Sequence, residues 1–259
     1  MFEELNQRLG WGSAAPLEKG LLLISSEDTD GGFLLHHFLS LFVKHKLPVL
    51  LVTLSQSFSH YAQACMKIGA NLEKARANGH VCCINIMEEL VSNYLEFRQL
   101  DEEEEEEEEK NINLTKTSNI NHIQEIFSIV NSRIEGLSDT MCTSLLVIDD
   151  ICTLFGLGFS VCDIERFVHY LTIVSKTKRM LLVILMPCFR ESKYCRLSKF
   201  LTYSAQIIIK VSALPSGHSK DVHGCLQILR KDTPDSIWQY KLHDKNLHIF
   251  AKGTSSAVL

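Results

Sequence analysis

Short apolar runs alternate with stretches of helical periodicity along most of the chain. The first run, residues 20–26, is rich in Leu and Ile, as expected of a strand buried on both faces of a parallel sheet. The next stretch, residues 33–46, repeats apolar side chains at intervals of three and four, which is typical of an amphipathic helix. The alternation predicts βαβ units. Strands are expected at 20–26, 49–54, 81–86, 144–150, 180–186 and 206–211, and helices at 33–46, 59–69, 120–134, 163–176 and 194–203.

The pattern changes near the carboxyl terminus. Residues 224–230 and 237–242 alternate apolar and polar side chains, and 247–251 follows them through the turn-forming cluster HDKN. Such runs favour antiparallel strands added to an otherwise parallel sheet. We therefore expect a single three-layer α/β domain over residues 1–259, mostly parallel, with antiparallel strands at its end.

An acidic run interrupts the periodic pattern. Residues 101–109 carry nine consecutive negative charges, which repel one another and cannot pack onto a core. We expect a disordered insertion at about residues 100–118. The chain has a formal net charge of −5 and the run supplies −9, so the remainder carries +4. This mild excess neither favours nor excludes a nucleic-acid partner.

Cysteine spacing and hydropathy indicate which metal sites, membrane spans and cellular compartments the chain is compatible with. None of the nine cysteines forms a CxxC pair, so we expect no metal site and reduced thiols in an intracellular protein. No apolar stretch approaches the roughly 20 residues of a membrane span. The start, MFEELNQRLG, has acids where a signal peptide needs positive charge. These features predict a cytoplasmic, or also nuclear, protein without a membrane partner.

The segment SSEDTDGGF stands between the first strand and the first helix, where nucleotide-binding α/β proteins keep a phosphate loop. In the pattern GxxxxGK[ST], Ser26 replaces the first glycine and Gly31 keeps the second. Gly32 then replaces the lysine that neutralises phosphate, and Phe33 replaces the hydroxyl residue that holds magnesium.

Three carboxylates, Glu27, Asp28 and Asp30, lie in the part of this degenerate loop that would surround the phosphates. Each would repel a phosphate by about 1–4 kcal/mol at contact distance. The helix N-terminus offers about half a positive charge in return. We therefore predict that the loop binds no ATP and no other cofactor. Asp28 or Asp30 is expected to cap the helix instead, with the glycines permitting the turn.

The apolar strand LLVIDD resembles the second nucleotide-site element, which ends in a magnesium-linked aspartate. Without a hydroxyl at position 33, Asp149 lacks a partner for magnesium, so Asp149 and Asp150 are expected to cap or orient the loop at 151–160. The adjacent His36 and His37 point about 100° apart on a helix and cannot chelate one ion together; one is expected to face the core. No catalytic residues are predicted.

Cations and aromatic rings are interleaved in PCFRESKYCRLSKF, after the 180–186 strand. Such a pattern can follow a sugar–phosphate backbone and stack bases. It is equally typical of the solvated face of a helix, and the two interpretations carry similar weight. The candidate RNA contacts are Arg190, Lys193, Arg196 and Lys199.

Several segments together resemble the Elongator complex protein 6 family. They are DGGFLLHHFLS, QSFSHY, LLVIDD, KDVHG and the final YKLHDKNLHIFAKGTSSAVL, spread from residue 30 to residue 259. None is a catalytic signature, but as a set they are specific, and only the acidic insertion falls outside the likeness.

The resemblance implies a RecA-like ATPase fold that has lost its nucleotide motifs. It also implies assembly with Elongator proteins four and five into a heterohexameric ring with two copies of each subunit. The ring would join the catalytic Elongator subcomplex, bind tRNA and support modification of the wobble uridine at position 34.

Two other functions remain open from the residues alone. One is an active P-loop NTPase of the RecA/KaiC type with an irregular phosphate loop, which the missing lysine and hydroxyl residue disfavour. The other is a free-standing RNA-binding module, which would call for a more basic surface than +4.

Overall fold

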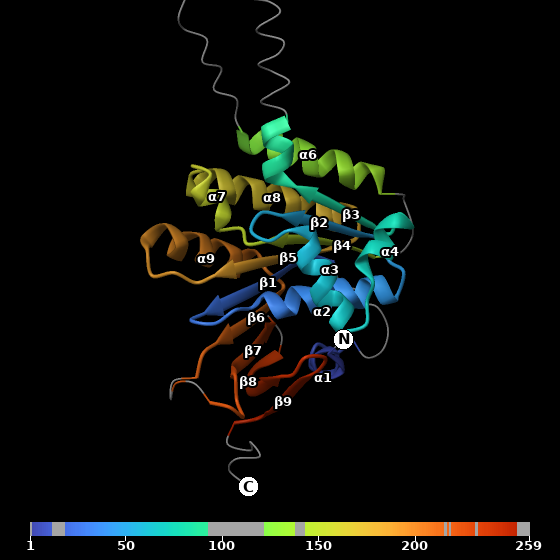
Figure 1. Ribbon diagram of the computed structural model, residues 1–259. Coiled ribbons are helices and arrows are strands. Elements are labelled where there is room, and N and C mark those ends of the chain that lie inside the picture. Colours follow the sequence, from blue (N-terminus) through green and yellow to red (C-terminus); the bar gives the residue numbers. More distant parts are fainter. Residues whose placement is uncertain are drawn as a thin grey trace, which may run out of the picture.

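The computed structural model describes residues 2–11, 19–92, 122–137, 143–214, 217, 219–230 and 233–252. The acidic run 101–109 and the expected insertion at 100–118 lie outside these residues. Within them, one nine-stranded sheet has the order β3-β2-β4-β5-β1-β6-β7-β8-β9 (Figure 1). The first six strands in this order are parallel to one another, and β7, β8 and β9 each pair antiparallel with the strand before them.

The strands lie close to the predicted positions, including the antiparallel carboxyl-terminal three. They are β1 (Gly20–Glu27), β2 (Val49–Thr53), β3 (Val81–Asn85), β4 (Ser144–Asp149), β5 (Met180–Pro187), β6 (Ile207–Ser212), β7 (Gly224–Arg230), β8 (Thr233–Leu242) and β9 (Leu247–Ala251).

Helices cover both faces of the sheet, which confirms the three-layer expectation (Figure 1). On one face lie α1 (Glu3–Arg8), α2 (Gly32–Lys44), α3 (Phe58–Lys67) and α4 (Leu72–Ala77). On the other lie α6 (His122–Gly136), α7 (Thr153–Gly156), α8 (Val161–Thr177) and α9 (Ser192–Ser204). A further helical segment starts at 86 and is described to 92.

Alternation along each central strand feeds two separate cores. In β1, Leu22 and Ile24 pack with α1 and α2, whereas Leu21 and Leu23 pack with α8 and α9. Neighbouring strands divide their side chains in the same way, because successive residues of a strand point to opposite faces. This double burial explains why these strands are continuously apolar in sequence.

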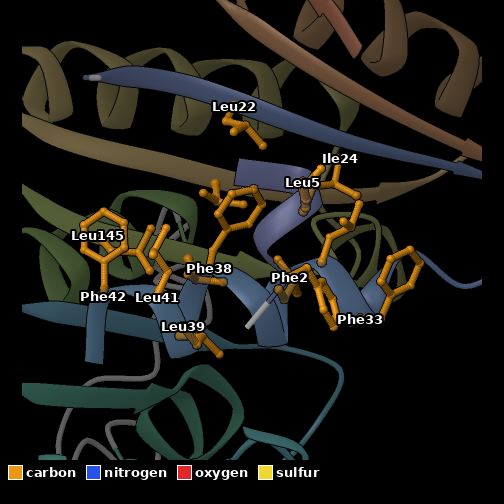
Figure 2. Close-up of a cluster of buried hydrophobic side chains, with 14 of the residues drawn as sticks. Phe2, Leu5, Leu22, Ile24, Phe33, Phe38, Leu39, Leu41, Phe42 and Leu145 are labelled. Carbon is orange, nitrogen blue, oxygen red and sulfur yellow. The ribbon is translucent and has the colours of Figure 1, made fainter. Parts of the chain in front are cut away.

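The helix that follows β1, α2, is buried along most of its length. Phe33, Phe38 and Phe42 point from α2 into the core beneath β1 and β4, as Figure 2 shows. Phe33 is only 8% exposed, and its ring lies 6.2 Å from that of Phe2 and 5.4 Å from that of Tyr240. The residue at the hydroxyl position of a phosphate loop is therefore a core residue.

A short helix at the start of the chain, α1, was not predicted. The backbone N–H of Phe2 donates to Nδ1 of His37 at 3.0 Å, and Nε2 of the same ring lies 2.9 Å from Oδ1 of Asn6. Burial lowers the pKa of His37 to about 3, so the ring is neutral and Nε2–H donates to Asn6. His36 instead contacts the rings of His60 and Tyr61, which confirms that the two histidines point apart.

Two further short helices, α4 and α7, were also not predicted, and α7 falls within the loop expected at 151–160. No helix among the described residues is long and apolar enough to span a membrane.

Replacing Phe33 by Ala should lower the free energy of unfolding by about 3–5 kcal/mol, because a buried ring is removed and a cavity remains. Chemical denaturation of the purified protein measures this loss. Phe189→Ala is the matched control, since that ring is 48% exposed and should contribute far less. Equal losses for the two variants would contradict the placement of Phe33.

Candidate functional site

The carboxyl ends of the parallel strands form the edge where open α/β sheets bind ligands. The degenerate phosphate loop follows β1 at this edge and leads into α2. Asp149 ends β4, and the strand between them, β5, leads to the basic stretch on α9. The structure thus brings all the sequence-predicted site segments to one edge.

A carboxylate of the chain itself occupies the start of α2. The backbone N–H of Gly32, which would face a phosphate in a working loop, donates to Oδ1 of Asp30 at 2.7 Å. Ser26 is buried, and its carbonyl accepts from the N–H of Cys188 at 2.7 Å, which closes the loop against the end of β5. Of the two aspartates proposed as caps, Asp30 fills that role, while Asp28 has a left-handed backbone with φ of 53°.

Gly31 is required for close packing rather than for an unusual backbone angle. Its φ is −91°, which any residue adopts. A Cβ atom there would lie 3.1 Å from a methyl of Ile24, 3.2 Å from one of Leu185 and 3.2 Å from Cβ of Ser26. The glycine therefore permits the turn by allowing close contact between helix and sheet, and not by adopting an unusual backbone angle.

Asp149 is held by the loop and helix after β2. It is 2% exposed, its Oδ2 accepts from the N–H of Gln56 at 3.0 Å, and it also accepts from the hydroxyl of Tyr61. Burial raises the pKa of Asp149, whereas these two hydrogen bonds favour the ionised form. Its expected role in orienting the 151–160 loop is thus wrong: this carboxylate orients the connection from β2 to α3.

Asp150 does orient the loop at 151–160, as expected. Its Oδ1 accepts from the N–H of Cys152 at 3.0 Å, and its backbone is left-handed, with φ of 49°. Burial raises the pKa of Asp150 to about 6, and the neighbouring Asp149 adds to the shift. Both strand-end carboxylates therefore accept hydrogen bonds from backbone N–H groups of the chain itself.

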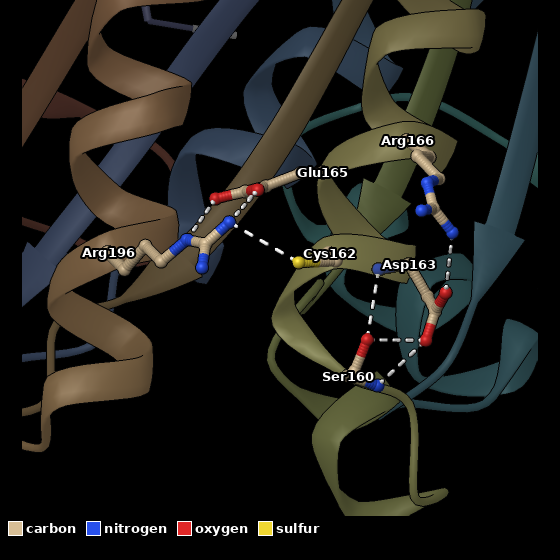
Figure 3. Close-up of polar contacts among 6 residues, drawn as sticks. All are labelled: Ser160, Cys162, Asp163, Glu165, Arg166 and Arg196. Atoms are coloured by element: carbon tan, nitrogen blue, oxygen red, sulfur yellow. Dashed lines mark hydrogen bonds and ion pairs between the residues drawn. The ribbon is translucent and has the colours of Figure 1, made fainter.

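The basic stretch is partly neutralised by contacts within the chain. Arg196 forms a two-pronged ion pair with Glu165 of α8, with N–O distances of 3.0 and 2.8 Å, and its Nη2 lies 3.3 Å from Sγ of Cys162 (Figure 3). Lys193 lies 3.6 Å from Glu191, with its ammonium over the rings of Phe155 and Tyr194. Arg196 therefore joins α8 to α9.

The other two cations of the stretch, Arg190 and Lys199, are exposed to solvent. Neither side chain forms a hydrogen bond or ion pair with another described residue. These two are the members that remain available to an outside partner.

Sequence reasoning missed Tyr61 and Gln56, which hold Asp149. Both lie in QSFSHY, a segment that carried the family resemblance but no predicted role, and a helix pattern alone does not tell which polar atom meets a particular strand end. No group of three or more potential metal-ligating side chains occurs among the described residues.

Changing Asp150 to Asn tests the burial of this carboxyl group. A folded-state pKa raised from 3.8 to about 6 means that the ionised side chain costs stability as pH rises through that interval, and the cost is constant above it. Asn keeps the acceptor and tolerates the left-handed backbone. The variant should be more stable by about 1–2 kcal/mol at about pH 7.5, allowing for partial solvent screening.

The gain from this substitution should vanish near pH 4, where Asp150 is largely protonated. Thermal unfolding at both pH values measures it, with Asp244→Asn as a charge-matched control in the exposed turn after β8. A gain independent of pH would show that the carboxyl group is not the cause.

Comparison with solved structures identifies the fold. An uncharacterized protein from Pyrococcus horikoshii, solved with an unknown peptide, is 14% identical with a TM-score of 0.59, covering 97% of this chain and 98% of its own. The flagellar accessory protein FlaH from Methanocaldococcus jannaschii is 12% identical with a TM-score of 0.60, covering 95% and 94%. Both are RecA-like, so the expected RecA-like fold is confirmed.

Comparison with curated sequences identifies the family. Elongator complex protein 6 from Xenopus tropicalis is 31% identical and that from Homo sapiens 28% identical, each over the full length of both chains. The family model described as "Elongation complex protein 6" matches residues 2–244. The chain therefore belongs to the Elongator complex protein 6 family and is a subunit of Elongator.

Proposed function

We propose that this chain is a non-catalytic Elongator subunit that acts by assembly and RNA binding. It forms a heterohexameric ring with Elongator proteins four and five, two copies of each, which joins the catalytic Elongator subcomplex. The ring binds tRNA and supports conversion of the wobble uridine U34 to mcm5U, mcm5s2U and ncm5U. It works in the cytoplasm and also in the nucleus.

The hydrogen bond from Gly32 N–H to Asp30 carries the non-catalytic part of the proposal. A phosphate bound at this helix start would have to displace a carboxylate already seated on the N–H group. Glu27 and Asp28 are exposed beside it, and no lysine stands at either glycine position. The loop therefore presents negative charge where a triphosphate needs positive charge.

Exposed apolar side chains on two helices support assembly. Tyr170 and Ile173 on α8 are 51% and 49% exposed, and Tyr203 on α9 is 83% exposed. Large apolar residues exposed together are typical of surfaces that meet a partner. A subunit whose α8 and α9 are covered only in a ring would behave poorly as an isolated monomer.

Titration with ATP and magnesium tests the non-catalytic proposal against the alternative of an active P-loop NTPase. The purified chain, or a ring whose sister subunits have disabled loops, should show no saturable binding at micromolar ATP. Saturable binding that is abolished when residues 26–33 are changed would establish a nucleotide-binding subunit instead.

The double variant Gly32→Lys, Phe33→Ser restores two motif residues and should still be inactive. A Cβ at position 32 would lie 3.0 Å from Oδ1 of Asp30, and all three carboxylates of the loop would remain. The substitution also removes a core ring, so folding of the variant must be checked by circular dichroism. ATP hydrolysis by this folded variant would contradict the electrostatic reason for inactivity.

Reconstitution with Elongator proteins four and five tests the ring and its tRNA binding. Native mass spectrometry should give two copies of each subunit, and the ring should bind tRNA with strong salt dependence. Arg190→Ala with Lys199→Ala should weaken binding and reduce the salt slope by about one for each phosphate that is no longer neutralised. Arg196→Ala is unsuitable for this purpose, because it also breaks the ion pair with Glu165.

An unchanged salt slope in the Arg190/Lys199 variant would move the RNA contact away from α9. A ring that binds no tRNA at all would overturn the proposed function itself.

A further inference from the structure

Six helices of the described structure end with a residue in the left-handed conformation, and they fall into two groups. Four of them, α1, α3, α4 and α7, place glycine there, at Gly10, Gly69, Gly79 and Gly158. The other two, α2 and α8, place Lys46 and Arg179 there, with φ of 56° and 55°. A long cation thus stands in two positions where the other described helices with this ending have glycine.

This choice is unfavourable for the fold. In the left-handed region the Cβ atom crowds the following carbonyl oxygen, so glycine is preferred at the position after a helix end. At α2 the turn is otherwise regular: Lys46 N–H donates to Val43 C=O at 3.1 Å and Leu47 N–H to Phe42 C=O at 3.0 Å. A strained backbone that persists points to a role for the side chain.

The two strained cations lie at the same edge of the sheet. Lys46 precedes β2 and Arg179 precedes β5, and these strands flank β4 in parallel register. Neighbouring strands are about 4.8 Å apart, so the starts of β2 and β5 lie about 10 Å from each other, and the two turns reach them from α2 and α8 on opposite faces of the sheet. Lys19 precedes β1, the strand on the other side of β5. This is the amino edge, opposite the degenerate phosphate loop (Figure 1).

Positive charge is concentrated along this edge. Six exposed cations lie in the turns before β1, β2 and β5 or in the last helical turn ahead of them, and we call them the amino-edge surface: Lys19, Lys44, Lys46, Lys176, Lys178 and Arg179. Of these, Lys44 also donates from Nζ to the carbonyl of Ile68 at 3.0 Å. Within the described parts of these three turns, 19, 44–48 and 176–179, there is no Asp or Glu. Lys46 and Arg179 make no side-chain hydrogen bond or ion pair with another described residue.

Stabilisation of helix dipoles accounts for only part of this surface. Cations are favoured in the last turn of a helix, which suits Lys44 and Lys176. It does not require a second cation in a strained position two or three residues further on, where glycine would close the turn without strain.

We propose that the amino-edge surface binds the phosphate backbone of RNA. This rests on the proposed function, for which it supplies a binding surface separate from α9. The partner is RNA rather than protein because the turns before β1, β2 and β5 contain none of the large exposed apolar side chains; Tyr203 lies at the same edge but before β6. Protein interfaces need an apolar centre, whereas phosphate contacts need only cations placed along the backbone.

The double variant Lys46→Gly, Arg179→Gly separates binding from folding within the reconstituted ring. Glycine relieves the backbone strain, so the thermal midpoint should stay equal or rise, while tRNA affinity should fall by on the order of tenfold at about 0.1 M salt. The slope of log affinity against log salt should decrease by about one to two. Lys245→Gln with Lys252→Gln is the control, since it removes the same charge from exposed positions near β9.

The outcomes are distinct from those for the proposed function. If the unchanged ring binds tRNA and the glycine variant matches the control in affinity and salt slope, the amino-edge assignment is wrong and the proposed function stands. Unchanged tRNA binding with weaker assembly would make the edge a protein interface and equally overturn the assignment. If the glycine variant fails to assemble, Lys46→Asn with Arg179→Asn keeps the left-handed turn and repeats the test.

Discussion

Close contact at Gly31 decides how α2 leaves the sheet. With no Cβ at this position, the start of α2 lies directly against Ile24 and Leu185. The helix then carries Phe33, Phe38 and Phe42 under the central strands, and its buried His37 anchors α1. A helix start displaced by one methyl group would disturb the core on this whole face, since protein interiors transmit such strain.

The polar groups at the positions that contact the ligand in a nucleotide-binding enzyme here form hydrogen bonds within the chain. Asp30 accepts from the helix start, Asp149 from Gln56 and Tyr61, and Asp150 from Cys152. Each carboxylate accepts from a backbone N–H of a nearby loop, and the bonds of Asp149 and Asp150 are partly buried. Asp149 thereby joins the end of β4 to the connection after β2, whereas Asp30 and Asp150 accept hydrogen bonds within their own loops.

Strands buried on both faces were predictable because their apolar runs are continuous and bounded by turns. The short helices α1 and α4 were not, because six residues are too few to show a period. For the loop, charge alone predicted that Asp28 or Asp30 would cap the helix in place of a bound phosphate. The partners of Asp149 could not be predicted, because Tyr61 reaches it only through the packing of α3 beside β4. Arg196 likewise fitted an RNA-binding pattern, and only the position of α8 revealed its ion pair with Glu165.

The anchoring of the chain's start bears on how the protein is handled. Phe2 is 3% exposed, stacks on His37 with ring centroids 5.2 Å apart, and donates its N–H into the interior. An affinity tag or fluorescent protein joined ahead of Phe2 has little room beside this packed residue. Unless the linker turns directly towards solvent, the fusion will displace Phe2 from the core. Fusions at the carboxyl terminus join the chain beyond β9, whose Ile249 N–H donates to Glu4 of α1, and they leave Phe2 itself in place, so they are the better choice for purifying the complex.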